Sequence, residues 1–157
     1  MLSIVFICTG NTCRSPMAEW ISKKYIRELN LQDEVKVASA GVAAWGEAPI
    51  SQGANRALLR RQVEEATTHR ARLVDESILE EADLVLTMSE NHRRTLIHLY
   101  PPYHKKIYNL LSYATGIPGD IADPFGGGDD IYEEAAKQVE NACRDLLLKI
   151  NAQLGKL

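Results

Sequence analysis

Short apolar runs alternate with amphipathic stretches along the whole chain. Runs rich in Ile, Val and Leu are typical of strands that are buried on both faces of a parallel sheet. Between these runs, apolar residues recur at the spacing of a buried helical stripe. Strands that alternate with helices predict an α/β fold, in which an open parallel sheet carries helices on both faces. The predicted strands cover residues 2–8, 35–39, 83–88 and 106–109, and the predicted helices cover about 16–29, 51–61, 75–82, 89–100 and 131–154.

Turn-forming residues set the expected boundaries of two of these helices. Ser15 followed by Pro16 is the pattern of an N-cap and a first helical position. Residues 116–130 are rich in Gly, Asp and Pro, which predicts a long loop before the last helix. Asp130 is a candidate cap for that helix.

The composition fits one folded domain that spans residues 1–157, with 45% hydrophobic and 25% charged residues. The net charge of −3 argues against nucleic acid as a partner. No apolar run reaches the length that spans a bilayer, and the first residues lack the basic leader of a signal peptide. Three cysteines without the spacing of metal ligands argue against a disulfide framework and against a bound metal. We therefore expect a cytoplasmic protein without a membrane partner.

The strongest chemical signal is the segment of residues 8–15, which reads Cys-Thr-Gly-Asn-Thr-Cys-Arg-Ser. It joins the first predicted strand to the first predicted helix, where parallel sheets bind their ligands. Gly10 and Asn11 allow a sharply turned backbone, so that successive N–H groups can converge on one oxyanion at a helix N-terminus. Arg14 adds a two-pronged donor for phosphate oxygens. The expected phosphate-binding residues are Thr9, Gly10, Asn11, Thr12, Cys13 and Arg14.

Cys8 lies at the start of this loop and is the expected nucleophile. A helix N-terminus and a neighbouring arginine both stabilise the thiolate form of a cysteine. The segment does not match the ATP-binding P-loop, because Gly10 is not followed by Gly-Lys-Ser/Thr at the required spacing. Cys8 is therefore expected to attack a phosphoryl group rather than to hold a nucleotide.

Expulsion of a poor leaving group needs a proton donor. Asp123 precedes Pro124 in the glycine-rich loop, which makes it a candidate general acid. Asp120, Asp129 and Asp130 remain alternatives when the residues are considered alone.

Residues 8–19, Cys-Thr-Gly-Asn-Thr-Cys-Arg-Ser-Pro-Met-Ala-Glu, resemble the signature of the low-molecular-weight protein-tyrosine-phosphatase family. The resemblance implies a single-domain three-layer sandwich around a four-stranded parallel sheet of order 2-1-3-4. It also implies a hydrolase without metal or cofactor, which takes phosphorylated proteins as substrates and releases phosphate through a cysteinyl-phosphate. Further matching segments are residues 39–41, 69–72, 82–88 and 123–127.

The same resemblance implies a role for each site residue. Cys8 would be the nucleophile, Arg14 the phosphate clamp and Asp123 the general acid. Ser15 would hydrogen-bond the thiolate, and Asn11 would hold the loop open. The residues implied to support Asn11 are Ser39 and His69.

The expected substrate depends mainly on Thr12. Most tyrosine-directed members carry a bulky aliphatic residue at this position, whereas threonine resembles the protein-arginine-phosphatase branch. Threonine is small and polar, so it accommodates a planar guanidinium that isoleucine would leave without partners. Phe125 stands alone after Asp-Pro because Gly126 replaces a second aromatic residue. Trp45 would supply another wall, and this keeps phosphotyrosine as the alternative substrate.

Cys13 and the remaining chemical groups leave several alternatives open. Cys13 either forms a reversible disulfide with oxidised Cys8 or packs the loop as a small buried residue. Cys143 is expected to be structural. A thiol-coupled arsenate reductase would need more cysteines between Cys13 and Cys143, and a non-catalytic phosphate-binding module would not need the catalytic set. The histidines expected at the surface are His92, His98 and His104.

Overall fold

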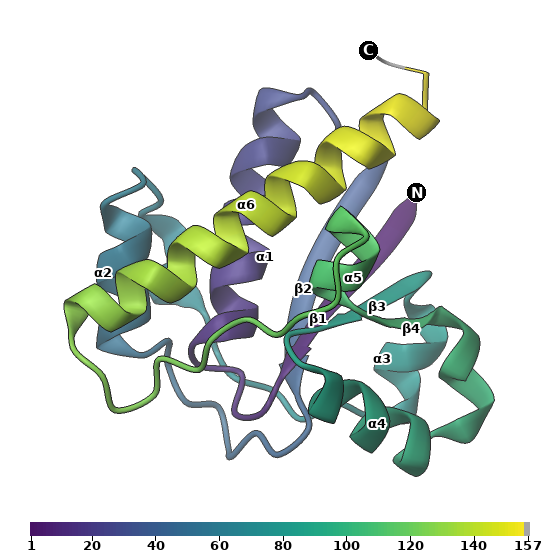
Figure 1. The fold of residues 1–157 in the computed structure, drawn as a ribbon, viewed down its shortest axis with the longest axis horizontal. Coiled ribbons are helices and arrows are strands. Elements are labelled where there is room, and N and C mark those ends of the chain that lie inside the picture. Colours follow the sequence, from purple (N-terminus) through teal and green to yellow (C-terminus); the bar gives the residue numbers. More distant parts are fainter. Residues whose placement is uncertain (156–157) are drawn as a thin grey trace.

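The computed structural model describes residues 1–155, which form an α/β fold around one parallel sheet (Figure 1). Its strand order is β2-β1-β3-β4, as expected from the family resemblance. All three strand pairs are parallel. The strands are β1 (Leu2–Cys8), β2 (Val35–Gly41), β3 (Leu84–Thr87) and β4 (Ile107–Asn109).

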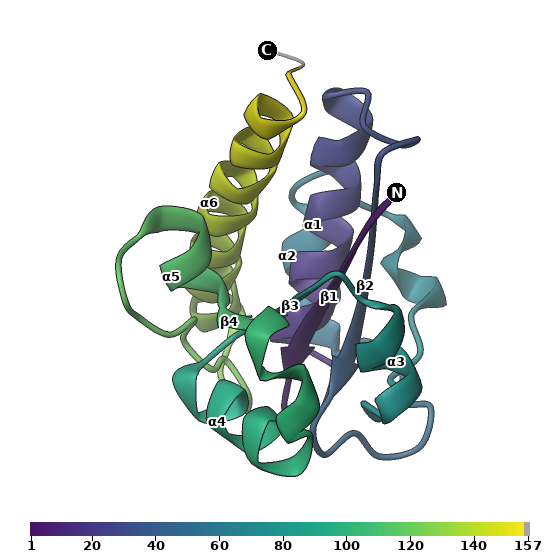
Figure 2. The same ribbon diagram turned by 90° about the vertical axis from the view of Figure 1, so that its right-hand side faces the viewer.

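Helices cover both faces of this sheet, which gives the three layers that were expected (Figure 2). Alternate residues of β1 face the two sides. Ile4 and Phe6 pack in the core cluster with α1, α2 and α6, whereas Val5 and Ile7 pack with α3 and α4. The helices are α1 (Arg14–Glu28), α2 (Gln52–Leu59), α3 (Glu76–Glu81), α4 (Glu90–Leu99), α5 (Leu110–Thr115) and α6 (Asp129–Gln153), with 3-10 helices η1 (Glu65–Thr68) and η2 (Pro101–Lys106).

Two expected helix caps are wrong. The helix α1 begins at Arg14 with Cys13 as N-cap, so Ser15 is already inside the first turn. The physical reason is that the Ser15 hydroxyl contacts Cys8 instead of capping the helix. The helix α6 begins at Asp129 after the N-cap Gly128, which leaves Asp130 in the first turn, where a carboxylate favours the helix dipole without capping it.

The sheet places the end of β1 against β2, and this fixes where the loop after Cys8 can run. Cys8 pairs with Gly41 in the register of the two strands. A Cβ atom on Gly41 would lie 2.4 Å from the Thr9 carbonyl oxygen and 3.0 Å from the Asn11 nitrogen. The loop therefore lies directly on the backbone of Gly41, and only glycine leaves room for it.

An ion-pair cluster joins α6 to the residues that follow α2. The Arg61 guanidinium lies 2.7 Å from one Glu133 carboxylate oxygen, and Arg60 also pairs with Glu133 at 2.9 Å. Arg61 is additionally 3.4 Å from Glu140. The hydrogen bonds from Arg61 lower the pKa of Glu133 to about 2, against its burial, which raises it.

We expect this cluster to make the stability of the protein sensitive to acid. Because the folded pKa of Glu133 is depressed, its contribution is present above the unfolded pKa and is lost as pH falls towards about 2. The pair is partly exposed to solvent, so the loss is about 1 kcal/mol or less. The free energy of unfolding, measured with urea at several pH values in this acid range, should fall less steeply with falling pH for Glu133→Gln than for wild type. A variant with the wild-type slope would contradict this prediction.

Candidate active site

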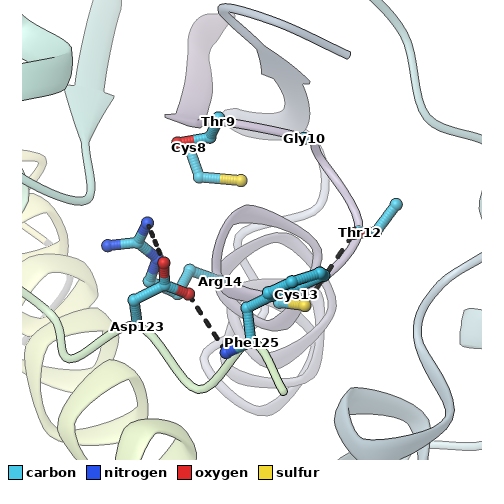
Figure 3. Close-up of a pocket in the computed structure, with 8 residues that line it drawn as sticks. All are labelled: Cys8, Thr9, Gly10, Thr12, Cys13, Arg14, Asp123 and Phe125. Atoms are coloured by element: carbon cyan, nitrogen blue, oxygen red, sulfur yellow. Dashed lines mark hydrogen bonds and ion pairs between the residues drawn. The ribbon is translucent and has the colours of Figure 1, made fainter. Parts of the chain in front are cut away.

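A cavity of about 270 Å³ lies at the carboxyl end of β1. Figure 3 shows that its lining side chains come from two segments: the end of β1 with the following loop and the start of α1, and the loop before α6. The position is that predicted for ligand binding in a parallel sheet. The lining residues are Cys8, Thr9, Gly10, Thr12, Cys13, Arg14, Asp123 and Phe125.

The loop between β1 and α1 wraps around the sulfur of Cys8. Cys8 is only 3% exposed, and the Asn11 backbone N–H donates to its Sγ at 3.3 Å. Asn11 has φ of +58°, a left-handed conformation that asparagine tolerates better than most residues. The N-terminus of α1 follows at once, and an anion above the sulfur would meet its positive end.

The Asn11 side chain has only one orientation that satisfies its neighbours. The Arg72 backbone N–H donates to Asn11 Oδ1 at 3.0 Å, which fixes the amide oxygen. Asn11 Nδ2 therefore donates to both Ser15 Oγ and Ser39 Oγ, each at 2.9 Å. The three residues expected to hold the loop are thus in contact.

This orientation also fixes the hydroxyl of Ser15. Its oxygen accepts from Asn11, and its hydrogen is left to donate to Cys8 Sγ at 2.9 Å or, at the longer distance of 3.5 Å, to the Ala40 carbonyl. The shorter contact assigns the hydrogen to the sulfur. Two donors, the Ser15 hydroxyl and the Asn11 N–H, therefore point at Cys8 and stabilise negative charge on it.

Glu19 completes this network, although the sequence did not single it out as a site residue. The Ser39 hydroxyl donates to Glu19 Oε1 at 2.6 Å, and Lys23 Nζ pairs with Glu19 Oε2 at 2.7 Å. Glu19 is 9% exposed. Glu19 is the last residue of the family signature, but its (i, i+4) spacing to Lys23 is common on solvated helix faces. Glu19 is buried only because the tertiary fold covers it.

His69 supports Asn11 from the other side. Its Nε2 donates to the Asn11 carbonyl oxygen at 2.8 Å, and the ring is 6% exposed. The segment after His69 is held to the neighbouring loop by the hydrogen bond from Ala71 N to the Ala48 carbonyl. The left-handed turn at Asn11 is therefore held through both its backbone and its side chain.

Arg14 and Asp123 lie together at the cavity. Arg14 Nη1 donates to the Ile121 carbonyl at 3.1 Å, and Nη2 lies 3.6 Å from Asp123 Oδ2. Asp123 is held in a turn by the Phe125 N–H, which donates to Oδ1 at 3.2 Å. Its side chain is 59% exposed, whereas that of Arg14 is 9% exposed. The guanidinium is therefore fixed by the protein, and the carboxylate remains accessible to a substrate.

Two of the competing aspartates, Asp120 and Asp129, have partners away from the cavity. Asp120 accepts from the Glu90 N–H at 2.9 Å, at the start of α4, and from Asn109 Nδ2 at 3.4 Å. Asp129 pairs with Arg56 at 2.8 Å. Of the aspartates in this loop, Asp123 is the one that lines the cavity.

The comparison with known families agrees with this geometry. Residues 3–156 match the family described as low molecular weight phosphotyrosine protein phosphatase. The chain belongs to this family. Cys8, Arg14 and Asp123 thus surround the cavity of a member of the phosphatase family.

Relatives within the phosphatase family have names of two kinds. A protein-arginine-phosphatase of Bacillus subtilis is 39% identical over 145 residues, which cover 92% of this chain and 94% of the relative. A low molecular weight protein-tyrosine-phosphatase of Streptomyces coelicolor is 33% identical, with 96% and 94% covered. The solved structure of the arginine phosphatase YwlE from Geobacillus stearothermophilus has a TM-score of 0.90 at 33% identity, covering 98% of this chain and 95% of that one.

The structure places the three specificity candidates of this phosphatase differently. Thr12 and Phe125 both line the cavity, and Phe125 is 82% exposed at its mouth. Trp45 is 89% exposed and is not among the lining residues. Its role as a second wall stays a prediction.

Cys13, the second cysteine of residues 8–14 (the phosphate loop), packs against the start of α2 and against α6. Cys13 is 7% exposed, and its Sγ contacts Ser51 Oγ and the Tyr132 hydroxyl, each at 3.4 Å. Burial, followed by the hydrogen bond with Cys13, raises the pKa of Tyr132. Tyr132 was not among the predicted site residues, because its contact with α2 joins segments that are far apart in the sequence. All three cysteines are free thiols, and within residues 1–155 no cluster of His, Cys, Asp or Glu is placed to hold a metal ion.

The expectation that His92 lies at the surface is wrong. His92 is 4% exposed and contacts Thr9 of the phosphate loop. The polar sequence of α4 suggested a solvated helix, but its first turn packs against the end of the sheet. No periodic signal in the sequence could reveal this contact, because it joins residues far apart in the chain.

Proposed function

We propose that the chain is a protein-arginine phosphatase, which removes phosphate from phosphoarginine side chains through a cysteinyl-phosphate. The observation that carries the proposal is Thr12, a small polar residue that lines the cavity beside Cys8. A relative named protein-arginine-phosphatase, 39% identical over nearly the full length, supports the same substrate. The substrates would be phosphorylated proteins, and free phosphate would be a product.

In the first step the Cys8 thiolate attacks phosphorus in line with the departing nitrogen. The S–P bond forms as the P–N bond breaks, and protonated Asp123 donates its proton to the guanidine nitrogen. Arg14 and the N–H groups of the loop hold the equatorial oxygens, on which negative charge is distributed. Because Arg14 is already oriented by Ile121, it needs little rearrangement to bind.

In the second step water attacks the same phosphorus from the side that the arginine has left. The Asp123 carboxylate takes the proton from this water, the P–S bond breaks, and phosphate is released. The electron pair returns to Cys8 as a thiolate. The Ser15 hydroxyl and the Asn11 N–H stabilise this leaving group.

The cavity suits a guanidinium better than a phenyl ring. A guanidinium carries N–H donors, and those that a pocket removes from water need acceptors in the protein. The Thr12 hydroxyl can accept one of them, whereas an aliphatic side chain would leave the donor unpaired. Among residues 1–155, Phe125 is the one aromatic residue that lines the cavity, so little aromatic surface is available to stack on a phenyl group.

Protein-tyrosine phosphatase is the second candidate function. Phe125 is strongly exposed at the mouth, where its ring can contact a flat substrate. Trp45 lies on the loop between β2 and α2 and is also strongly exposed. A relative named protein-tyrosine-phosphatase shares 33% identity with this chain. The choice between the two functions depends on measurement with both substrates.

The proposed function is tested by Thr12→Ile assayed on a phosphoarginine peptide and a phosphotyrosine peptide. We expect wild type to prefer phosphoarginine. The variant should lose about 10- to 100-fold in kcat/KM on phosphoarginine, because a guanidinium donor left without an acceptor weakens binding by such a factor. Activity on phosphotyrosine should be maintained. Thr12→Ser retains the hydroxyl and is the matched control. An unchanged ratio of the two activities in Thr12→Ile would contradict the role of Thr12, and a wild-type preference for phosphotyrosine would favour the second candidate.

Two further properties belong to this proposal. A reversible disulfide between oxidised Cys8 and Cys13 would protect the nucleophile from irreversible oxidation. The support for it is that both are free thiols on one short loop, both lining the cavity. A catalytic thiolate needs reducing surroundings, and with an odd number of cysteines this favours the cytoplasm.

A further inference from the structure

A nearly buried histidine connects the phosphate loop to α4. His92 lies in the first turn of this helix and is 4% exposed. Its Nε2 lies 2.8 Å from Thr9 Oγ1, and its Nδ1 lies 2.9 Å from Ser89 Oγ. Thr9 directly follows the nucleophile and lines the cavity. The mechanism described above gives His92 no role, although the ring touches the loop that carries the chemistry.

His92 is uncharged near neutral pH. Burial of the ring, followed by the nearby Arg14 guanidinium, lowers its pKa to about 4, although Asp120 and Asp123 act in the opposite direction. A neutral imidazole has one N–H donor and one acceptor nitrogen. The two contacts of the ring must therefore have opposite directions.

Ser89 decides which nitrogen carries the hydrogen. The Ser89 oxygen already accepts from the His92 backbone N–H at 3.2 Å, as the N-cap of α4, and Ser89 is 8% exposed. If its hydroxyl donates to Nδ1, the Ser89 hydroxyl and both ring nitrogens are satisfied: Nε2–H donates to Thr9 Oγ1, and the hydrogen of the exposed Thr9 hydroxyl is left for solvent. In the reverse arrangement the hydrogen of the buried Ser89 hydroxyl would lose this partner, which is costly. The geometry therefore favours the tautomer with the hydrogen on Nε2.

We propose that His92 is a positioning residue for the phosphate loop and acts through the Thr9 hydroxyl. The Thr9 carbonyl accepts from the Ala43 N–H at 2.9 Å, so the turn after β2 holds the backbone of Thr9 and His92 holds its side chain. These two contacts fix the first peptide groups after Cys8. Their N–H groups then need no reorientation when a phosphoryl group binds.

This role depends on the phosphate-binding part of the proposed function and not on the preference for arginine. It is therefore measured with an aryl phosphate as substrate and with inorganic phosphate as ligand. If the chain hydrolyses the aryl phosphate but not phosphoarginine, the proposed substrate fails while His92 can still be tested. If the chain hydrolyses neither, binding of inorganic phosphate still reports on His92.

The experiment is a double-mutant cycle of His92→Leu and Thr9→Val. We expect each single variant to lose about three- to tenfold in kcat/KM and in affinity for phosphate, which corresponds to the loss of one hydrogen bond. The double variant should be no worse than either single variant, because both changes remove the same contact. Effects that multiply in the double variant would overturn the proposal. His92→Gln, whose amide can still donate to Thr9, should keep most of the activity. If His92→Gln and His92→Leu are both as stable as wild type and lose the same amount of activity, the proposal is also overturned.

A second measurement does not require His92→Leu to fold. The ¹⁵N chemical shifts of the His92 ring in wild type distinguish protonated from unprotonated nitrogens. We expect protonated Nε2 and unprotonated Nδ1 near neutral pH, and the Nε2–H signal should shift in Thr9→Val. Ring signals that are the same in wild type and Thr9→Val would overturn the proposal, because the His92 ring would then not be bound to the Thr9 hydroxyl.

Discussion

Replacing Cys8 with serine is expected to reduce turnover by about 10⁴- to 10⁶-fold, the usual cost of removing a nucleophile. A serine hydroxyl stays protonated near neutral pH, and it would receive the Ser15 and Asn11 hydrogens that otherwise stabilise a thiolate. Binding of phosphate should change little, because Arg14 and the loop N–H groups provide it. Calorimetric titration with inorganic phosphate and steady-state assays with an aryl phosphate measure the two effects separately.

A matched comparison uses Cys13, the other cysteine of the loop. Rapid quenching followed by mass spectrometry should trap a phosphorylated protein in wild type and in Cys13→Ala. The Cys8→Ser variant lacks the Cys8 sulfur, so it should not form the cysteinyl-phosphate. Because the Cys13 sulfur contacts Ser51 and Tyr132, we do not expect it to replace the nucleophile. Full activity in Cys8→Ser would contradict a covalent route through this residue.

The strand–loop–helix unit that carries Cys8 was predictable because each part has a local cause. Buried parallel strands are continuous apolar runs, and residues 2–8 form such a run. Gly and Asn allow the turn, and the helix follows at once. By contrast, α5 was missed because it is only six residues long and follows β4 without a break. Its capping residues, Asn109 before it and Gly116 after it, fall at the end of the predicted strand 106–109 and at the start of the predicted loop 116–130.

Site residues that depend on the tertiary fold were not predictable in the same way. Glu19 and Lys23 look like an ordinary surface pair, and His92 lies on a polar helix. Each becomes part of the site because another segment covers it. Ser15 shows the opposite case, since its sequence position is typical of a cap, but the structure uses its hydroxyl on the sulfur. Polar residues that break a local rule therefore gather around the phosphate loop, as expected of a functional site.

Replacing Asp123 with asparagine is expected to lower kcat by about 10²- to 10⁴-fold on a phosphoarginine peptide, the usual contribution of general acid–base catalysis. The asparagine amide cannot give a proton to the guanidine nitrogen or take one from water. An aryl phosphate with a good leaving group needs less protonation when it departs, so its attack step should slow much less. The hydrolysis step should slow for both substrates, because they share the same cysteinyl-phosphate.

These two effects separate when the steps are observed individually. With the activated aryl phosphate, Asp123→Asn should still show a rapid burst of phenol, followed by slow turnover as the phosphorylated protein accumulates. Asp129→Asn is the matched control, because Asp129 pairs with Arg56 on the surface and does not line the cavity. It should retain wild-type kinetics. A uniform loss in both variants would reflect the charge of the loop, whereas near-normal phosphoarginine turnover in Asp123→Asn would mean that another group supplies the proton. Asp120 is bound to the start of α4 and Asp123 lines the cavity, and for this reason we propose Asp123 as the acid.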